Sequence, residues 1–145
     1  MGRARDVQYI DPINTQQDVA VGIGLPFAGT NSVFNLNYTT EDQAMSNLIN
    51  LVLTKKGERI MQPAFGWGGW SLLFEPNTND FVDELEISFK RDVNYWLPYI
   101  TINEVNFKTV EHTIMMSAKV SIEPSGANKT ITFDLSSGGT TITED

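Results

Sequence analysis

The chain has 145 residues, a formal net charge of −8 and no cysteine, and its residues are 41% hydrophobic and 19% charged. This composition predicts one folded domain with a single hydrophobic core. The acidic balance argues against nucleic-acid binding and against electrostatic docking on an anionic membrane. Without cysteine, disulfides and thiolate metal sites are excluded. We also expect no secretory signal and no membrane-spanning helix, because no apolar run is long enough for either.

The first 38 residues show no helical period. The segment "DVQYIDP" predicts a short strand that ends at Asp11, because the following Pro12 restricts that residue. The glycine-rich segment "AVGIGLPFAGTNSVF" at 20–34 is typical of an ordered loop or an irregular strand. We therefore treat residues 1–21 as an N-terminal extension of one domain that spans residues 1–145.

The first predicted helix covers residues 40–55. Thr40 is the expected N-cap, and Gln43 three residues later completes a capping-box pattern. Gly57 follows the helix and suits the left-handed position that ends it. Apolar residues recur at helical spacing and predict one buried stripe, which consists of Ala44, Met45, Leu48, Ile49, Val52 and Leu53.

A second helix is predicted from about Asn79 to Leu97, where Pro98 must end it. Its expected buried stripe consists of Phe81, Leu85, Phe89, Val93 and Trp96. The charged residues of this segment scatter around the other faces, so we interpret them as solvated and not as metal ligands. The acids weighed as metal ligands are Asp80, Asp83, Glu84 and Glu86, and Lys90 and Arg91 are expected to face outward with the last two of them.

From Ile100 onward the apolar period becomes two, which predicts strands. Ile100 and Ile102 share one face, whereas Val105 and Phe107 continue out of phase, so we expect a β-bulge between the two pairs. Two further strands follow, on either side of a turn at 123–129. Their alternating residues are Ile114, Met116, Ala118, Val120 and Ile122 in the first, and Ile131, Phe133 and Leu135 in the second.

The sequence thus predicts an α+β fold, with two helices packed on a small antiparallel β-meander that has an exposed edge strand. Such an edge matters because its unpaired main-chain groups can template a strand from another chain. Residues 136–145 form a polar tail that we expect to be disordered in the free protein, although Thr140–Thr143 has strand propensity. The tail is also a candidate for a strand that orders only in an assembly.

Candidate catalytic groups are few. The single histidine, His112, stands in or beside a turn, which favours a solvated side chain. Glu58 and Glu75 flank the glycine-rich stretch and are the pair that a glycosidase would use as acid and nucleophile. Arg59 adjoins Glu58, so an ion pair of Arg59 with Glu58 or with Glu75 is at least as natural a role. We expect no cofactor and no metal, and "GWGGW" lacks the lysine and the following helix of a phosphate site.

Two tryptophans, Trp67 and Trp70, lie in the unusual stretch "TKKGERIMQPAFGWGGW", residues 54–70. Aromatic side chains serve cores and interfaces alike. One interpretation therefore has a tryptophan closing the core between the two helices. The other has it bind a protein partner or a carbohydrate.

Residues 53–76, "LTKKGERIMQPAFGWGGWSLLFEP", resemble the signature of the lysozyme-like baseplate wedge proteins of contractile-tailed phages, a family that includes the baseplate subunit of type VI secretion systems. The matching positions are Leu53, Thr54, Gly57, Glu58, Arg59, Ile60, Met61, Pro63, Phe65, Gly66, Leu73, Phe74, Glu75 and Pro76. The segment "GIGLPF" at 22–27 is similar to the family's Gly-x-Gly-x-x-Phe segment, so the resemblance spans roughly residues 22–135. After the second helix the family carries Glu-Pro-Arg, whereas this chain has Leu97-Pro98-Tyr99. Any role of that Glu and Arg therefore does not transfer.

The resemblance implies a structural protein, not an enzyme, that is present in multiple copies in the sixfold baseplate of a virion and is assembled in the host cytoplasm. It implies the wedge core-bundle proteins and the tail sheath protein as partners, with tail-tube or hub-adjacent proteins as a further option. It also implies a sheet on which the first sheath ring assembles by strand exchange. The residues that we expect at these partner surfaces are Gly57, Glu58, Arg59, Phe65, Gly66, Trp67, Trp70, Leu97, Pro98, Tyr99, Ile131, Phe133 and Leu135. We expect Leu72, Leu73 and Phe74 to pin the signature to the core and to leave Trp67 or Trp70 exposed for the wedge bundle.

Two other functions stay open at this point. A lysozyme-like glycosidase that cleaves peptidoglycan would need Glu58 and Glu75, and a cell-wall turbidity assay with glutamine variants of both residues would detect it. A protein-binding adaptor outside any tail would need neither residue. Copurification of the chain with its partners distinguishes the adaptor from a baseplate protein.

Overall fold

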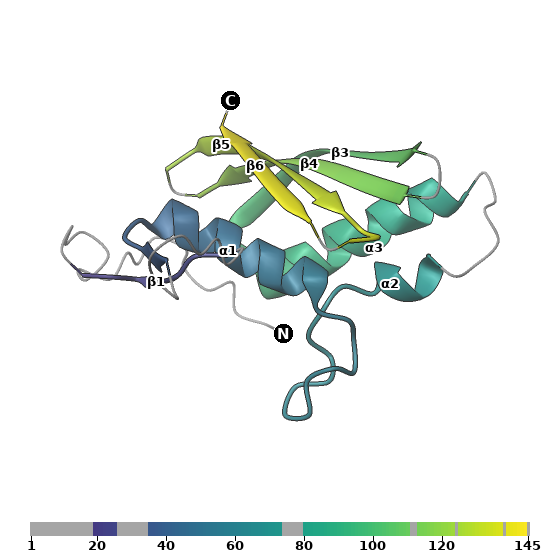
Figure 1. Ribbon diagram of the computed structural model, residues 1–145, viewed down its shortest axis with the longest axis horizontal. Helices are drawn as coiled ribbons and strands as arrows, with labels where there is room; N and C mark the ends of the chain where they lie inside the picture. Colours follow the sequence, from purple (N-terminus) through teal and green to yellow (C-terminus); the bar gives the residue numbers. More distant parts are fainter. Residues whose placement is uncertain are drawn as a thin grey trace.

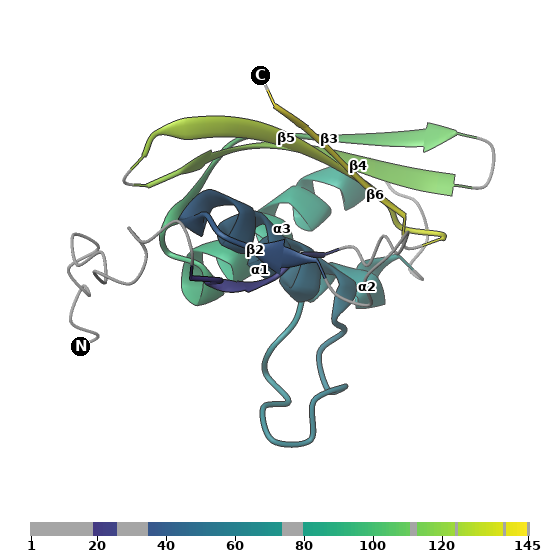
Figure 2. The same cartoon turned by 60° about the vertical axis from the view of Figure 1, so that its left-hand side comes forward.

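The computed structural model describes residues 19–25, 35–73, 80–110, 113–123, 125–137 and 139–144. Helices pack against one face of an antiparallel sheet, and a long loop projects from the helical layer on the side away from the sheet (Figures 1 and 2). This arrangement confirms the α+β class. The elements in chain order are β1 (Gly22–Ile23), β2 (Leu36–Asn37), α1 (Thr40–Leu53), α2 (Gly69–Leu72), α3 (Phe81–Trp96), β3 (Ile100–Val110), β4 (Thr113–Ile122), β5 (Ala127–Asp134) and β6 (Thr140–Glu144).

Helix α1 begins where the sequence predicts it, but a different residue caps it. Thr39 has an extended backbone, with φ −114° and ψ 147°, and its hydroxyl oxygen accepts a hydrogen bond of 3.1 Å from the Asp42 amide. The prediction of Thr40 as N-cap is therefore wrong, because Thr40 is already part of the helix. Gly57 does not end the helix either. Helix α1 ends at Leu53, and Gly57 adopts its positive φ of 93° in the loop that follows.

Helix α3 confirms the second predicted helix. Its central apolar residues, Leu85, Phe89 and Val93, are buried in the core. The residue after the helix, Leu97, has φ −128° and ψ 65°, which is not helical. This ending agrees with the prediction, because Pro98 disfavours a helical conformation of the residue before it.

The sheet has the strand order β3-β4-β5-β6, and every neighbouring pair is antiparallel. The predicted meander corresponds to β3, β4 and β5. The register between β3 and β4 shifts between Ile102 and Glu104, which confirms the predicted bulge. The sheet supplies apolar side chains to the core shared with the helices, and its buried members are Ile100, Val105, Met116, Ala118, Val120, Ile122, Ile131 and Phe133.

The C-terminal segment forms a fourth strand, which corrects the expectation of a disordered tail at 136–145. Residues 140–144 of β6 pair with residues 129–133 of β5. Asp134 supports the chain reversal, because its carboxylate accepts hydrogen bonds from the backbone amides of Ser136 and Ser137. The outer edge of β5 is therefore closed by the protein's own chain, and the outer strands of the sheet are β3 and β6.

A small hairpin of β1 and β2 packs on the side of α1. The Asn37 amide nitrogen Nδ2 donates to Ser46 Oγ at 2.9 Å, and the Leu25 backbone amide donates to the same oxygen at 3.1 Å. Part of the "GIGLPF" segment is thus strand β1, whereas its last two residues lie outside the described residues, as does the whole of "DVQYIDP". In the described part of the chain, no helix combines the length and apolar character needed to cross a membrane.

Candidate partner-binding site

Residues 55–67, here called the finger, project from the helical layer between α1 and α2 (Figure 1). The two ends of the finger meet in a parallel bridge between Lys55 and Trp67, and the Trp67 amide donates to the Thr54 carbonyl at 3.0 Å. Gly66 lies at this neck with φ 123°, and a Cβ atom there would lie 2.5 Å from the Thr54 carbonyl oxygen. A side chain at position 66 would therefore force the neck open.

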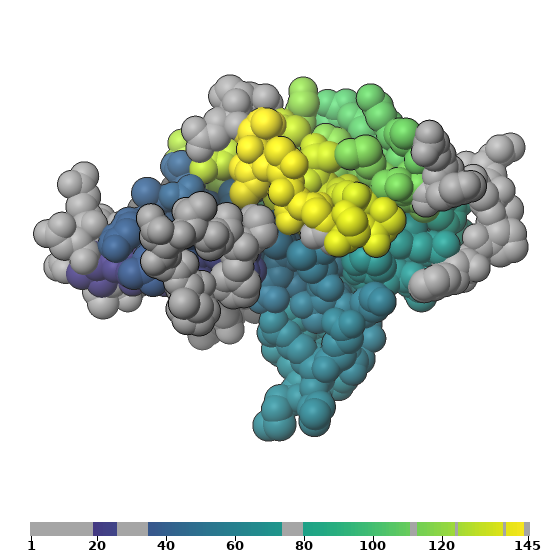
Figure 3. Space-filling view, viewed as in Figure 1, coloured from purple at the N-terminus to yellow at the C-terminus, as the bar shows by residue number. Residues whose placement is uncertain are grey.

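The tip of the finger is apolar and exposed. A turn spans residues 59–62, in which the Gln62 amide donates to the Arg59 carbonyl at 3.2 Å. Ile60 and Met61 occupy the middle of this turn, and their side chains are 95% and 96% exposed. Below the tip, the Gly57 amide donates to the Pro63 carbonyl at 2.8 Å and links the two arms. Figure 3 shows the finger as a protrusion that stands clear of the surrounding surface.

The charged residues of the signature stiffen the finger. Arg59 Nη2 donates to Asn50 Oδ1 at 3.1 Å, and the guanidinium lies over the Phe65 ring, 3.9 Å from its centroid. The Glu58 carboxylate accepts a hydrogen bond of 3.0 Å from the Lys55 amide. The expected ion pair between Glu58 and Arg59 is therefore not among those of the described residues, since each side chain binds elsewhere.

Trp67 belongs to the core, and Trp70 lies at its margin. Trp67 is 1% exposed and packs edge-to-face on Phe89, with ring centroids 6.2 Å apart. Trp70 is partly buried, and its indole N–H donates to the Val52 carbonyl at 2.7 Å. The hypothesis that Trp67 faces a partner is therefore wrong. Gly69 makes the burial possible, because a Cβ atom at that position would lie 2.1 Å from the Trp67 indole ring.

Asp92 of α3 fastens the base of the finger to the helices. Its buried carboxylate accepts hydrogen bonds from the Gly68 amide at 2.8 Å and from Lys56 Nζ at 2.9 Å, and Arg91 Nε lies 3.3 Å away. Sequence reasoning missed this residue because it placed only the apolar stripe of α3 in the core. Its position seven residues after Leu85 was the available signal, since residues at that spacing share a helix face.

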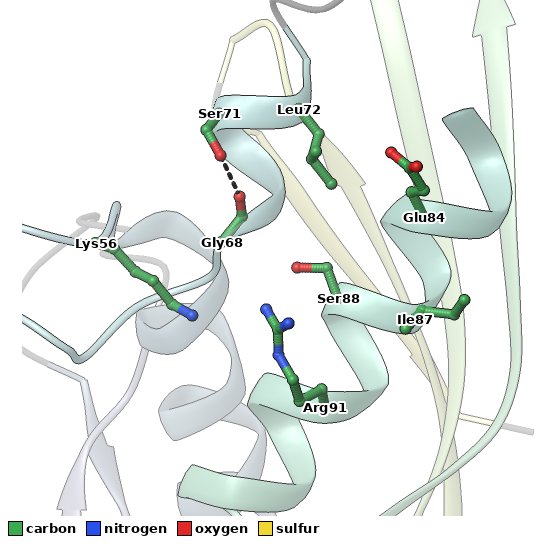
Figure 4. A pocket seen from close by; sticks show the side chains of 8 residues that line it. All are labelled: Lys56, Gly68, Ser71, Leu72, Glu84, Ile87, Ser88 and Arg91. Atoms are coloured by element: carbon green, nitrogen blue, oxygen red, sulfur yellow. Dashed lines mark hydrogen bonds between the residues drawn. The ribbon is translucent and has the colours of Figure 1, made fainter. Parts of the chain in front are cut away.

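A pocket of about 450 Å³ lies between α2 and α3, and Figure 4 shows Lys56, Ser88 and Arg91 around it. Among the described residues of its lining, Glu84 is the one carboxylic acid, whereas a glycosidase needs two facing carboxyls. Glu58 lies on the exposed finger, and Glu75 and His112 lie outside the described residues. Among the residues that the structure does describe, no three potential metal ligands of the His, Asp or Glu type gather in one place. The described residues of the lining are Lys56, Gly68, Ser71, Leu72, Glu84, Ile87, Ser88 and Arg91.

Helix α2, which borders this pocket, begins at Gly69 within "GWGGW", where the sequence predicts no helix. Leu72 and Leu73 are partly buried and pack against the core, as expected. Phe74, the third residue expected to pin this stretch, lies outside the described residues. A single helical turn is too short to leave a periodic pattern in the sequence, which is why the sequence does not predict it.

The stretch Leu97-Pro98-Tyr99 joins three elements. Leu97 is buried, and the Tyr99 hydroxyl accepts a hydrogen bond of 2.9 Å from Asn47 Nδ2 of α1. Burial of the phenol raises the pKa of Tyr99 above its ordinary value. The Tyr99 carbonyl accepts a hydrogen bond of 3.0 Å from the Glu123 amide after β4. Pro98 is the exposed residue of the three, so a partner at this stretch would contact mainly Pro98.

The predicted partner residues near β5 lie inside the protein. Ile131 and Phe133 are fully buried and Leu135 is 6% exposed, so their side chains pack toward the helices. A neighbouring chain therefore does not meet these side chains directly. Strand pairing at this sheet would use the main chain of an outer strand.

Solved structures of two other proteins share this fold. The chain superposes on a protein of Geobacter sulfurreducens called a "putative tail lysozyme" with a TM-score of 0.62 and 18% identity, covering 74% of this chain and 95% of that one. It superposes on a chain of the sixfold-symmetrised anti-feeding prophage baseplate with a TM-score of 0.58 and 18% identity, covering 70% of this chain and 83% of that one. These two structures have the same fold as this chain. Among curated proteins, none matches the sequence.

The sequence also matches the family model of the baseplate wedge protein gp25 over residues 39–134, which extend from the N-cap of α1 to the end of β5 and include the finger. The chain belongs to this family. It is a structural component of a phage-tail or contractile-injection baseplate, where it associates with other baseplate proteins.

Proposed function

We propose that the chain binds the core bundle of a baseplate wedge and provides the sheet on which the first ring of tail sheath assembles. The observation that carries this proposal is the sheet itself, in which β3 and β6 each pair with one neighbour within the described residues. An outer strand offers N–H and C=O groups that a strand from another chain can pair with. Assembly would take place in the host cytoplasm, and several copies would enter a sixfold virion baseplate.

The edge at β6 is the better acceptor of the two. Strand β3 carries a bulge between Ile102 and Glu104, and a bulge interrupts the regular row of main-chain groups on an edge. Strand β6 pairs with β5 in unbroken register, and residues 141–143 are exposed. We therefore assign the sheath contact to β6. The buried residues of β5 would support this contact indirectly, by holding the strand to which β6 is paired.

Two proline substitutions in β6 test this assignment. Thr141→Pro and Ile142→Pro, made separately, remove amides that point to opposite sides of the strand, because direction alternates along a strand. One variant therefore loses an amide on the β5 side and the other loses one on the outer side. We expect both chains to enter baseplates, and the outer-side variant to stop sheath assembly, as seen by electron microscopy of tails. Normal sheaths on baseplates that carry the variant without the outer-side amide would contradict the proposal.

We also infer that the chain acts without catalysis. Glycosidases hold two carboxyls on either side of a bound sugar, whereas Glu58 lies on the exposed finger, where it binds the Lys55 amide. Purified chain should not clear a suspension of bacterial cell walls. Clearing that is lost in Glu58→Gln or Glu75→Gln would show instead that the chain is a hydrolase.

A further inference from the structure

We infer that the finger is a preformed plug that inserts Ile60 and Met61 into an apolar pocket of another baseplate protein, and that acidic side chains line the rim of that pocket. This inference rests on the proposed function and deepens it, because it names the surface through which the chain binds the rest of the wedge. In this inference Ile60 and Met61 anchor the chain to the wedge. The tryptophans expected in that role, Trp67 and Trp70, lie in or near the core.

Two adjacent apolar side chains are almost fully exposed at one point of the surface. Ile60 and Met61 have a larger exposed fraction than every other large apolar residue that the structure describes. The next is Tyr95, at 75%. Single exposed apolar residues are ordinary in soluble proteins. These two differ because they share a turn at the end of a projection, so nothing in the described chain shields them from water. A partner that encloses them would remove apolar surface that folding leaves exposed.

The finger is held in shape without a partner. Its neck is closed at Gly66, and its arms are linked by the hydrogen bond from Gly57 to Pro63. Arg59 is fixed over the Phe65 ring and cannot swing freely. A loop that is ordered before binding loses little conformational entropy on binding, so even a small apolar contact contributes to affinity.

The shape and charge of the finger define the partner. A convex tip needs a concave site, and the isoleucine and methionine side chains need an apolar lining. Lys56 pairs with Asp92 at the base of the finger, but Lys55 and Arg59 still outnumber the acidic Glu58, although the whole chain has a net charge of −8. Carboxylates around the mouth of the partner's pocket would complement this local basic charge and would orient the finger as it enters.

The position of the finger suits a connecting role. The finger and β6 lie on opposite sides of the helical layer (Figures 1 and 2). A protein that grips the finger therefore leaves the outer side of β6 accessible. The chain can then be held in the wedge at one end while it meets the sheath at the other.

Two other occupants of the tip are less well supported. A membrane could accept an apolar tip flanked by basic residues, but an acidic chain with two apolar side chains at the tip binds anionic lipid poorly. A second copy of the chain offers the pocket between α2 and α3, whose lining includes Lys56 and Arg91. Glu84 is the single carboxylate among the described lining residues, so this pocket offers a basic finger no acidic rim.

The direct test replaces both tip residues in the full chain, as Ile60→Asp/Met61→Asp, in cells that produce the tail without the wild-type copy. We expect the amount of chain in purified baseplates to fall about tenfold or more, because each aspartate would place an unpaired charge in an apolar pocket. The melting temperature should not fall, since both side chains are exposed. Ile87→Asp, an exposed apolar residue of α3, is the matched control and should enter baseplates normally. Ile60→Leu/Met61→Leu should enter normally as well.

A photo-crosslinking residue at position 61 identifies the occupant of the tip. We expect one peptide of another baseplate protein, with apolar and acidic residues, and no such product from position 87. Crosslinking to a second copy, binding of the purified chain to phosphatidylglycerol vesicles that depends on Met61, or normal incorporation of the double-aspartate variant would each overturn the inference. Absence of the wild-type chain from baseplates would overturn the proposed function and this inference with it.

Discussion

At the residue scale, polar side chains join parts of the chain that are far apart in the sequence. The Thr39 hydroxyl donates to the Asp42 carboxylate at 2.6 Å, and Lys129 Nζ of β5 approaches the same carboxylate at 3.2 Å. The hydrogen bond from Thr39 is the largest cause that lowers the pKa of Asp42, and Lys129 adds to it, whereas partial burial opposes them. The sheet is thus tied to the first turn of α1, at the helix end that favours negative charge.

The two neighbouring threonines give a matched pair of substitutions. Thr39→Ala should lower the free energy of unfolding by about 1 kcal/mol, because it removes the hydroxyl that caps α1. Thr40→Ala should change it by less than about 0.5 kcal/mol, since Thr40 lies within the helix and has no capping role. Urea denaturation of both variants measures the difference. A larger loss in Thr40→Ala would mean that the capping-box prediction from the sequence was right after all.

At the element scale, the turn between β5 and β6 decides which edge the sheet presents. The Asp134 carboxylate accepts hydrogen bonds from the side chains and backbone amides of Ser136 and Ser137, and these bonds hold its pKa well below the ordinary value of 3.8. A carboxyl with a lowered folded-state pKa stabilises the fold above its ordinary pKa, and this contribution is lost as the pH falls through the folded value. Acid should therefore loosen the turn that returns β6 to the sheet.

Removal of the Asp134 carboxylate should release β6 selectively. In Asp134→Ala at neutral pH, we expect faster hydrogen exchange of the amides of residues 140–144 and unchanged exchange in α1. Acidification should have the same effect on the wild-type chain and little further effect on the variant. Asp83→Ala removes an exposed carboxylate of α3 and serves as the control. Equal protection of β6 in the wild type and in Asp134→Ala would show that the turn does not hold the strand.

The sequence predicts some elements better than others for physical reasons. Helix α3 and the bulge of β3 follow from local periodicity, because each depends on side chains within one segment. Strand β6 depends on a turn stabilised by Asp134 and on pairing with another strand. The polar composition of the segment reveals neither, and for this reason the sequence suggested a tail. The burial of Trp67 depends on contact with Gly69, and the exposure of Ile60 and Met61 depends on a projecting loop. An apolar pair in a sequence does not reveal such a loop.

At the scale of the whole molecule, the helical layer separates two surfaces. The sheet presents β6 on one side, and the finger presents its tip on the other (Figure 2). Asp92 joins the base of the finger to α3, and α3 packs against the sheet, so the two surfaces are attached to one hydrophobic core. This arrangement explains how a small acidic chain of a baseplate family would hold the wedge and the sheath in fixed relation.

A cryo-electron microscopy map of the assembled tail, clear enough to trace strands, tests the central claim most directly. We predict a strand of a tail sheath subunit hydrogen-bonded alongside the outer side of β6, with β6 still paired to β5. A map in which the outer side of β6 faces solvent, or in which the first sheath ring attaches elsewhere on the baseplate, would contradict it.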